Sequence, residues 1–250
     1  MMDYRNTTSE LSESGIDTVV IPLGSTEQMG PYLPMHMDTL IAELYAKAYG
    51  EMLNAYVLPV LPFNTSEEHA KFKGTVHVSP NSLTAFLEDI IVTLRKQGFR
   101  KFVLCCGHGG AYWEAAFVKH INYMYEDIVL VVPHHNLSDA WNEAIKAAGL
   151  EEAATEVHGG LLSVCTLMWL CPELVKLEEM GSDISRDTRK YMNIVMWDRL
   201  TVDGCWGKFT PGKYTKEQLA EKGRIFWTTF IAKRGEGLMS VSEKPLILGE

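Results

Sequence analysis

The stretch G-S-T-E-Q-M-G-P-Y-L-P-M-H-M-D-T, residues 24–39, gathers side chains that can bind a metal ion. Glu27 and Asp38 supply carboxylates, and His36 supplies an imidazole. A further histidine, His108, stands far along the chain in Gly-His-Gly-Gly. Carboxylate oxygen and imidazole nitrogen suit zinc, manganese or iron(II). These residue types favour a metal site, although Asp38 alone also suits a helix N-terminus and Glu27 alone suits a solvated loop.

The elements that must position these side chains alternate along the sequence. Short apolar runs rich in β-branched residues predict buried strands, and segments with helical spacing lie between them. The expected strands are 18–23, 56–61, 101–106 and 128–132, and the expected helices are 39–53, 82–96, 111–125 and 215–233. This order indicates an α/β fold with a mainly parallel central sheet flanked by helices. We expect a single domain over residues 1–250, with loops and one short helix over 181–215.

Chemistry in such folds collects at the carboxyl ends of the strands. The strand at 18–23 leads into Glu27, and the strand at 101–106 leads into His108. We therefore expect Glu27, Asp38 and His108 to lie together. A Cys106–His108 nucleophile is conceivable, but cysteines at the end of a buried strand more often pack as small hydrophobic residues.

Two further stretches carry histidines. His158 precedes a glycine pair and an expected apolar helix, and it could act as a general acid or base or be purely structural. In Ser-Glu-Glu-His, residues 66–69, the pair Glu68 and His69 could line a pocket or be solvated.

The composition argues against several classes of protein. The net charge is −9, and no run of Lys or Arg predicts a nucleic-acid or membrane surface. No apolar stretch reaches the roughly 20 residues of a membrane span, and no signal peptide is evident. The five cysteines have no CxxC spacing, which favours reduced thiols and a cytoplasmic location.

Taken in order, the motifs resemble those of the creatininase family of metal-dependent amidohydrolases. The family pattern G-S-x-E-Q-H-G-P-H-L-P, followed by D-T, is G-S-T-E-Q-M-G-P-Y-L-P here. The patterns S-x-E-H and N-G-H-G-G-N are S-E-E-H and C-G-H-G-G-A, and H-A-G-x-x-E-T-S is H-G-G-L-L-S-V-C. Near the end, G-C-W-G and E-K-G match the last family motifs. The resemblance extends roughly over residues 17–232.

This resemblance implies an α/β fold, a two-metal site and usually a hexamer. Members hydrolyse cyclic amides or related carbon–nitrogen bonds, and some relatives act on formamides or open cyclic diketones. Glu27, Asp38 and His108 match family metal ligands. His158 matches the histidine beside the reactive water.

The departures from the family pattern concern one of the two metals. Met29 replaces a ligand histidine, and Gly110 stands where creatininase has a glutamate ligand. Other motif positions also differ, namely Cys106, Ala111, Leu161, Leu162 and Ser163. A thioether does not replace imidazole on a hard divalent ion. We therefore expect one divalent ion per chain, zinc or manganese, on Glu27, Asp38 and His108, with His36 as a possible substitute ligand.

The expected function is hydrolysis of a small cyclic amide or related carbonyl compound, with His158 moving protons. Tyr32, Trp113 and Trp206 are expected to wall the substrate pocket. One alternative is a ring-opening hydrolase of a cyclic diketone, and another is a non-catalytic member that binds a ligand. The partners expected are a small-molecule substrate and further copies of the chain in a homo-oligomer, most simply a hexamer.

Overall fold

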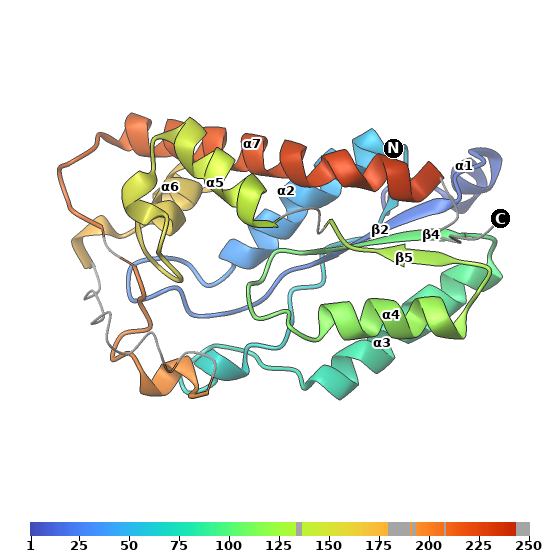
Figure 1. Ribbon diagram of the computed structural model, residues 1–250, viewed down its shortest axis with the longest axis horizontal. Coiled ribbons are helices and arrows are strands. Elements are labelled where there is room, and N and C mark those ends of the chain that lie inside the picture. The colour runs from blue at the N-terminus through green and yellow to red at the C-terminus, as the bar shows by residue number, and fades with distance from the viewer. Residues whose placement is uncertain (134–136, 180–190, 192–193, 208, 244–250) are drawn as a thin grey trace.

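A computed structural model describes residues 1–133, 137–179, 191, 194–207 and 209–243 (Figure 1). Its centre is a five-stranded sheet in the order β1-β3-β2-β4-β5, and every pair of neighbours is parallel. The strands are β1 (Met2–Asp3), β2 (Thr18–Leu23), β3 (Tyr56–Val57), β4 (Lys101–Cys106) and β5 (Val129–Val131). The predicted parallel α/β fold is confirmed. The expected strand at 56–61 is shorter because Pro59 cannot donate a ladder hydrogen bond, and only Leu61 again bridges to β2.

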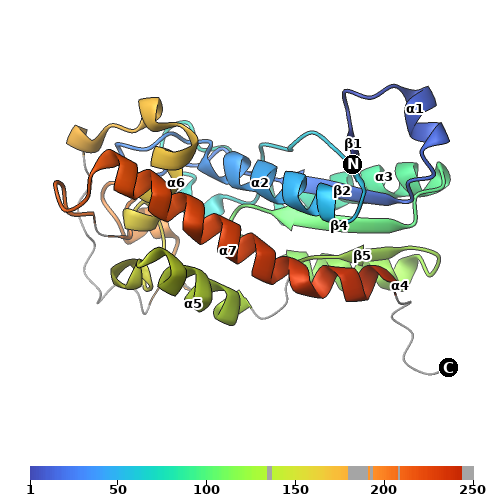
Figure 2. The same cartoon turned by 90° about the horizontal axis from the view of Figure 1, so that it is seen from above.

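Helices cover both faces of the sheet. They are α1 (Thr8–Glu13), α2 (Met37–Met52), α3 (Pro80–Lys96), α4 (Glu114–Met124), α5 (Leu137–Ala148), α6 (Leu161–Leu170) and α7 (Lys216–Glu243). Helices α3 and α4 lie on one face, and α2 and α7 lie on the other (Figures 1 and 2). The four predicted helices are confirmed with shifted ends, the apolar helix expected after His158 is α6, and α1 and α5 are additional. Among the described residues, no helix combines the length and apolar character that a membrane span requires.

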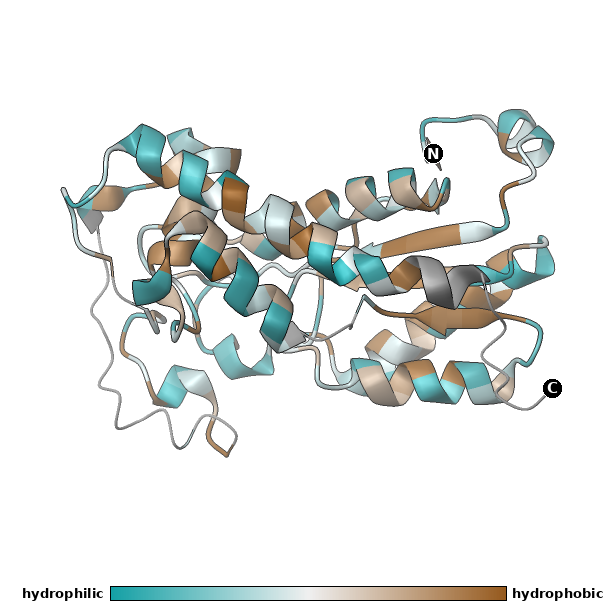
Figure 3. Ribbon diagram, turned by 45° about the horizontal axis from the view of Figure 1, so that its top comes forward, coloured by the Kyte–Doolittle hydropathy of each residue, from teal (hydrophilic) through white to brown (hydrophobic). Residues whose placement is uncertain are grey.

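Alternation along the strands divides the core into two parts. Val19 and Ile21 of β2 pack with the α3 and α4 side chains, whereas Val20 and Val103 pack with α2, α6 and α7. This is the period of two expected for a sheet covered on both faces. The brown strands between the helices in Figure 3 show this apolar layer.

The expected irregular region 181–215 lies partly outside the described residues. Its described part contains one short 3-10 helix, Trp197–Arg199, which packs beside the turn Glu67–His69. Both turns lie near the carboxyl ends of the strands, where the loops of the chain gather (Figure 1). The fold thus brings long connections over the edge of the sheet that carries Glu27 and His108.

Gly107 permits a close approach between the end of β4 and the first turn of α2. A Cβ atom at this position would lie 2.2 Å from the Asp38 carbonyl oxygen and 2.8 Å from the Ala42 nitrogen. No real Cβ atom tolerates such contacts with backbone. The glycine therefore allows α2 to bring Asp38 next to His108, the residue that follows Gly107.

We expect Gly107→Ala to lower the free energy of unfolding by about 2 kcal/mol or more, because the overpacked backbone must shift. Urea denaturation measures this difference. The matched control is Gly109→Ala, since a Cβ atom at Gly109 would meet nothing within 4 Å. That control should stay within about 0.5 kcal/mol of the wild type. Equal stability of the two variants would show that α2 does not approach β4 this closely.

Candidate metal centre

Glu27, Asp38 and His108 converge at the carboxyl ends of β2 and β4, as the sequence predicted for these three side chains. All three are at least nine-tenths buried. His108 Nδ1 lies 3.0 Å from Asp38 Oδ2 and 3.3 Å from Glu27 Oε2. One ligand atom from each residue lies within 4.8 Å of the other two. Three segments far apart in the chain thus supply two carboxylates and one imidazole to a single point.

A backbone contact orients the His108 ring. Its Nε2 lies 3.0 Å from the Thr65 carbonyl oxygen, which can only accept a hydrogen bond. Nε2 therefore carries a proton, and Nδ1 is the ring nitrogen that faces the two carboxylates and that would bind a cation in place of its own proton. Metal-binding histidines commonly have their second ring nitrogen fixed in this way.

The electrostatics of this cluster also fit a bound cation. Burial raises the pKa of Glu27, and Asp38 adds to this effect while His108 opposes it. Burial lowers the pKa of His108, but Glu27 and Asp38 outweigh that effect and raise it to about 10. Glu27 Oε2 is buried without a hydrogen-bond partner. A divalent cation would satisfy that oxygen and neutralise both carboxylates, so the donor set fits zinc or manganese.

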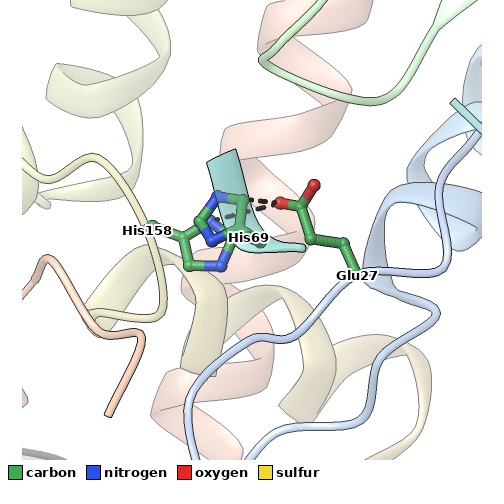
Figure 4. Close-up of side chains that lie close together, drawn as sticks. All are labelled: Glu27, His69 and His158. Carbon is green, nitrogen blue, oxygen red and sulfur yellow. Dashed lines mark ion pairs between the residues drawn. The ribbon is translucent and has the colours of Figure 1, made fainter. Parts of the chain in front are cut away.

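His69 and His158 approach the other oxygen of Glu27 (Figure 4). His69 Nε2 lies 3.4 Å from Glu27 Oε1, and His158 Nδ1 lies 3.7 Å from the same atom. The two imidazole rings stack with their centroids 4.5 Å apart. These three residues form a second group with metal-ligand spacing, which shares Glu27 with the first. The sequence left open whether His69 lines a pocket or is solvated, and it gave no sign of the contact with Glu27.

Hydrogen bonds to Gln28 show how these two rings are protonated. Gln28 Oε1 accepts from the Gly30 N–H at 2.8 Å, so its Nε2 is the donor that contacts Gly204 O and, at 2.7 Å, His69 Nδ1. His69 therefore accepts at Nδ1 and carries its proton on Nε2, which faces Glu27. In this arrangement the His69 Nε2–H faces Glu27 Oε1 at 3.4 Å, and Nε2 has no lone pair for a metal.

His158 has the opposite arrangement. Its Nε2 donates to the Gln28 carbonyl oxygen at 2.6 Å, which leaves Nδ1 as an acceptor facing Glu27. Burial lowers the pKa of both His158 and His69 and so favours their neutral forms. The described residues thus place one basic nitrogen, His158 Nδ1, beside the candidate metal centre.

Glu68 occupies the space next to Gly110. A Cβ atom at position 110 would lie 2.4 Å from His108 Nε2 and 2.9 Å from Glu68 Oε1. A side chain at position 110 would therefore displace His108 or Glu68. Glu68 is buried, accepts from the Tyr112 hydroxyl at 3.0 Å, and has no partner for its Oε2. This carboxylate faces the same cavity as the metal-ligand candidates.

His36 lies outside both ligand groups. It is the half-buried residue that precedes α2, and it does not line the cavity. Because Asp38 belongs to the first helical turn, two residues further along, the His36 ring projects from a different side of the chain.

The three aromatic residues predicted for the pocket wall do not line the cavity. The Tyr32 hydroxyl donates to the Gly159 carbonyl, which keeps it within the protein. Trp113 packs against Phe117 in the core beneath α4. Trp206 contributes its backbone, which forms a short antiparallel bridge with His158.

The cavity itself has a volume of about 750 Å³. One end holds the ligand candidates with Glu68, His69 and His158. The other end is walled by aromatic side chains of α2, α5 and α7, which are Tyr45, Trp141, Trp227 and Phe230. For Trp227 and Phe230, the sequence does offer an indication, because the apolar residues of α7 keep their helical spacing beyond the first turns of the helix.

Comparison with known proteins places the chain in a family. The Creatininase family model, described as creatinine amidohydrolase, matches residues 5–236, so the chain belongs to the creatininase family. Among curated relatives, the creatinine amidohydrolase of Pseudomonas putida is 25% identical over 188 residues, which cover 67% of this chain and 69% of the relative. The mycofactocin precursor peptide peptidase of Mycobacterium tuberculosis is 35% identical over 113 residues, 41% of this chain. The match spans only 45% of that peptidase.

Solved structures support the same fold. A Bacteroides fragilis relative of the creatinine amidohydrolases superimposes with a TM-score of 0.74 at 25% identity, covering 100% of this chain and 98% of the other. A creatininase structure of Zn-Zn type has a TM-score of 0.71 at 21% identity, covering 94% of this chain and 97% of the other. A manganese form of creatininase is also similar, with a TM-score of 0.69 at 20% identity, covering 96% and 98%.

Proposed function

We propose that this chain is a hydrolase of a small carbonyl compound, a cyclic amide or a related substrate, that uses one divalent ion per chain. The observation that carries this proposal is the buried cluster of Glu27, Asp38 and His108, in which Glu27 Oε2 has no hydrogen-bond partner. Membership of the creatininase family and the hydrolase relatives support it. A zinc or manganese ion held there would polarise the substrate carbonyl and lower the pKa of a water molecule.

The surrounding residues have separate tasks in this proposal. The Thr65 carbonyl holds the His108 ring through Nε2, so that Nδ1 stays directed toward the cation site. The His69 Nε2–H lies 3.4 Å from Glu27 Oε1 and positions that carboxylate by its electrostatic attraction. His158 Nδ1 accepts the proton of the attacking water and returns it to the leaving group, because its Nε2 proton is held by Gln28.

The direct test compares metal-free and metal-restored protein. Protein treated with a chelator should not hydrolyse creatinine, hydantoin or other small cyclic amides, and one equivalent of zinc or manganese should restore turnover of at least one of them. A cyclic 1,3-diketone in the same panel tests the ring-opening alternative. Absence of turnover on the whole panel with metal bound would favour a ligand-binding member, which the loss of ligand residues at Met29 and Gly110 also favours.

Cys106 is not expected to act as the nucleophile. Burial raises the pKa of its thiol to about 12, so the thiolate is scarce at neutral pH. We predict that Cys106→Ser retains turnover within a few-fold of wild type. The initial rates of the two proteins on the same substrate provide the comparison. A loss of a hundredfold or more in Cys106→Ser, with metal content unchanged, would contradict this assignment.

We also propose a homo-oligomer, most simply a hexamer. Support comes from the family and from exposed apolar side chains in the irregular region, where Tyr191 is 45% exposed and Ile194 is 77% exposed. Trp206, in the same region, is buried within the chain and gives no such support. Light scattering coupled to size exclusion should give several times the 28.1 kDa chain mass. A single-chain mass at micromolar concentration would contradict the proposal.

A further inference from the structure

The end of the cavity away from the metal-ligand candidates contains a cation. Arg234 of α7 lines the cavity and is 8% exposed. Tyr45 and Phe230 flank its guanidinium, whose central carbon lies 5.4 Å from the centroid of each ring. Aromatic side chains line this end together with the polar residues Ser138 and Asn142 of α5.

The hydrogen bonds of Arg234 do not neutralise its charge. Nε donates to the Pro133 carbonyl, and Nη1 donates to the Tyr45 hydroxyl at 3.1 Å. Within the part of the chain that the structure describes, no carboxylate forms an ion pair with Arg234. A guanidinium presents five N–H donors in a planar fork, so several remain available. A buried charge without a counter-ion is costly, and such groups are normally paired.

The charges that line the cavity are unevenly placed. Glu27, Asp38 and Glu68 lie at the metal-ligand end, Arg234 lies at the aromatic end, and a fourth carboxylate, Glu114 of α4, also lines the cavity. An anionic substrate group would be repelled from a carboxylate cluster that lacks its ion and attracted to the guanidinium. This separation of negative and positive side chains would orient a substrate with one anionic end, because that end would lie at Arg234.

The distance between the two ends of the cavity can be derived from α2, which contributes a residue to each end. Asp38 and Tyr45 are seven residues apart, which places them on the same face of the helix about 10 Å apart along its axis. Both line the cavity, and Tyr45 holds Arg234. A ligand reaching from the metal-ligand candidates to Arg234 must therefore extend over several bonds.

We propose that Arg234 binds a carboxylate of the substrate, so that the substrate is an amide or related carbonyl compound with a carboxylate several bonds from the reacting carbonyl. This inference rests on the proposed hydrolase function for the identity of the reacting end. A planar carboxylate matches the guanidinium fork, and the flanking rings of Tyr45 and Phe230 exclude water from the contact. The carboxylate can belong to a small acylated amino acid or to the C-terminus of a short peptide.

The test compares acids with their neutral amides. Benzoylglycine and benzoylglycinamide represent the small acids, and acetyl-trialanine and its C-terminal amide represent the peptides. Binding is followed by tryptophan fluorescence, since Trp141 and Trp227 line the cavity. Each pair is measured on the metal-loaded protein and again with chelator present, because a bound divalent ion would itself attract a carboxylate.

We expect at least one acid to bind about tenfold or more tightly than its amide, with or without metal, as for a charge-assisted hydrogen bond. Arg234→Met should remove this preference, and Arg234→Lys should retain part of it. The control is Arg224→Met on the same helix, because Arg224 is exposed and paired with Glu221. A preference in the benzoylglycine pair would indicate that the carboxylate belongs to a small acylated amino acid. A preference in the acetyl-trialanine pair would indicate that it belongs to the C-terminus of a peptide.

Several results would overturn the inference. They are equal binding of acid and amide to the wild-type protein, no binding of any probe, or an acid preference that survives Arg234→Met. The wild-type comparison needs no variant, so it decides the matter even if Arg234→Met fails to fold. Failure of the hydrolase proposal is distinguishable, because the acid preference would then persist in a protein that turns over no substrate.

Discussion

His108→Ala is expected to lose the divalent ion. Wild-type protein dialysed against zinc or manganese should retain one equivalent per chain by elemental analysis, and the variant should retain almost none. The reason is that His108 provides the single imidazole nitrogen beside Glu27 and Asp38. Loss of a residue that merely orients a ligand already weakens metal binding about 10- to 100-fold, so loss of a ligand should cost at least as much.

Thermal stability gives a second measurement that does not depend on activity. An ion present at a hundred times its dissociation constant stabilises the folded state by about 2.7 kcal/mol. Chelator should therefore lower the melting temperature of the wild type and leave that of His108→Ala nearly unchanged. The matched control is His120→Ala, which removes an exposed histidine on α4 and should behave like the wild type.

The number of ions also tests the protonation of His69. Two equivalents of tightly bound metal would mean that Glu27, His69 and His158 form a second site, which requires His69 to give up its Nε2 proton or the Gln28 amide to turn. Replacement of Met29 by histidine should add an ion only if a further carboxylate, such as Glu68 with its unpartnered Oε2, also serves as a ligand. No metal in the wild type, and no change in His108→Ala, would favour a non-catalytic member.

The sequence was sufficient to predict the first ligand group because of a general property of parallel sheets. Glu27 and His108 follow adjacent strands, β2 and β4, whose carboxyl ends must meet at one edge. Asp38 joins them because Gly107 lets the first turn of α2 approach closely. The central strands were predictable from their continuous apolar runs, whereas β1 and β3, two residues each, have too little pattern to be delimited.

The rest of the cavity depends on contacts that sequence spacing does not encode. His69 belongs to a three-residue turn, and its ring reaches Glu27 through packing against His158 and Trp197. The aromatic wall comes from α2, α5 and α7, and the expected residues Tyr32, Trp113 and Trp206 do not line this cavity. Arg234 did leave a signal, since it continues the apolar spacing of Phe226 and Phe230 along α7. A charged residue on such a stripe indicates a buried cation.

His158→Gln is expected to reduce kcat by about 10²- to 10⁴-fold while metal content stays at the wild-type value. Glutamine can still donate from its side-chain amide to the Gln28 carbonyl, as His158 Nε2 does. It offers no basic nitrogen in place of Nδ1, which faces Glu27 at 3.7 Å. The variant therefore separates proton transfer from the structural hydrogen bond. The measurement is steady-state kinetics on the substrate identified with the metal-restored enzyme, together with elemental analysis.

The His120→Gln variant provides the matched control, because it makes the same chemical change on the exposed side of α4 and should leave kcat unchanged. A small effect of His158→Gln on kcat would mean that water or Glu68 carries the proton, since Glu68 is the other carboxylate on the cavity wall with an unpartnered oxygen. Loss of metal from His158→Gln would instead make His158 a ligand. Metal content measured together with kcat distinguishes these three outcomes. Only a His158 that binds the metal ion would lose metal and activity together.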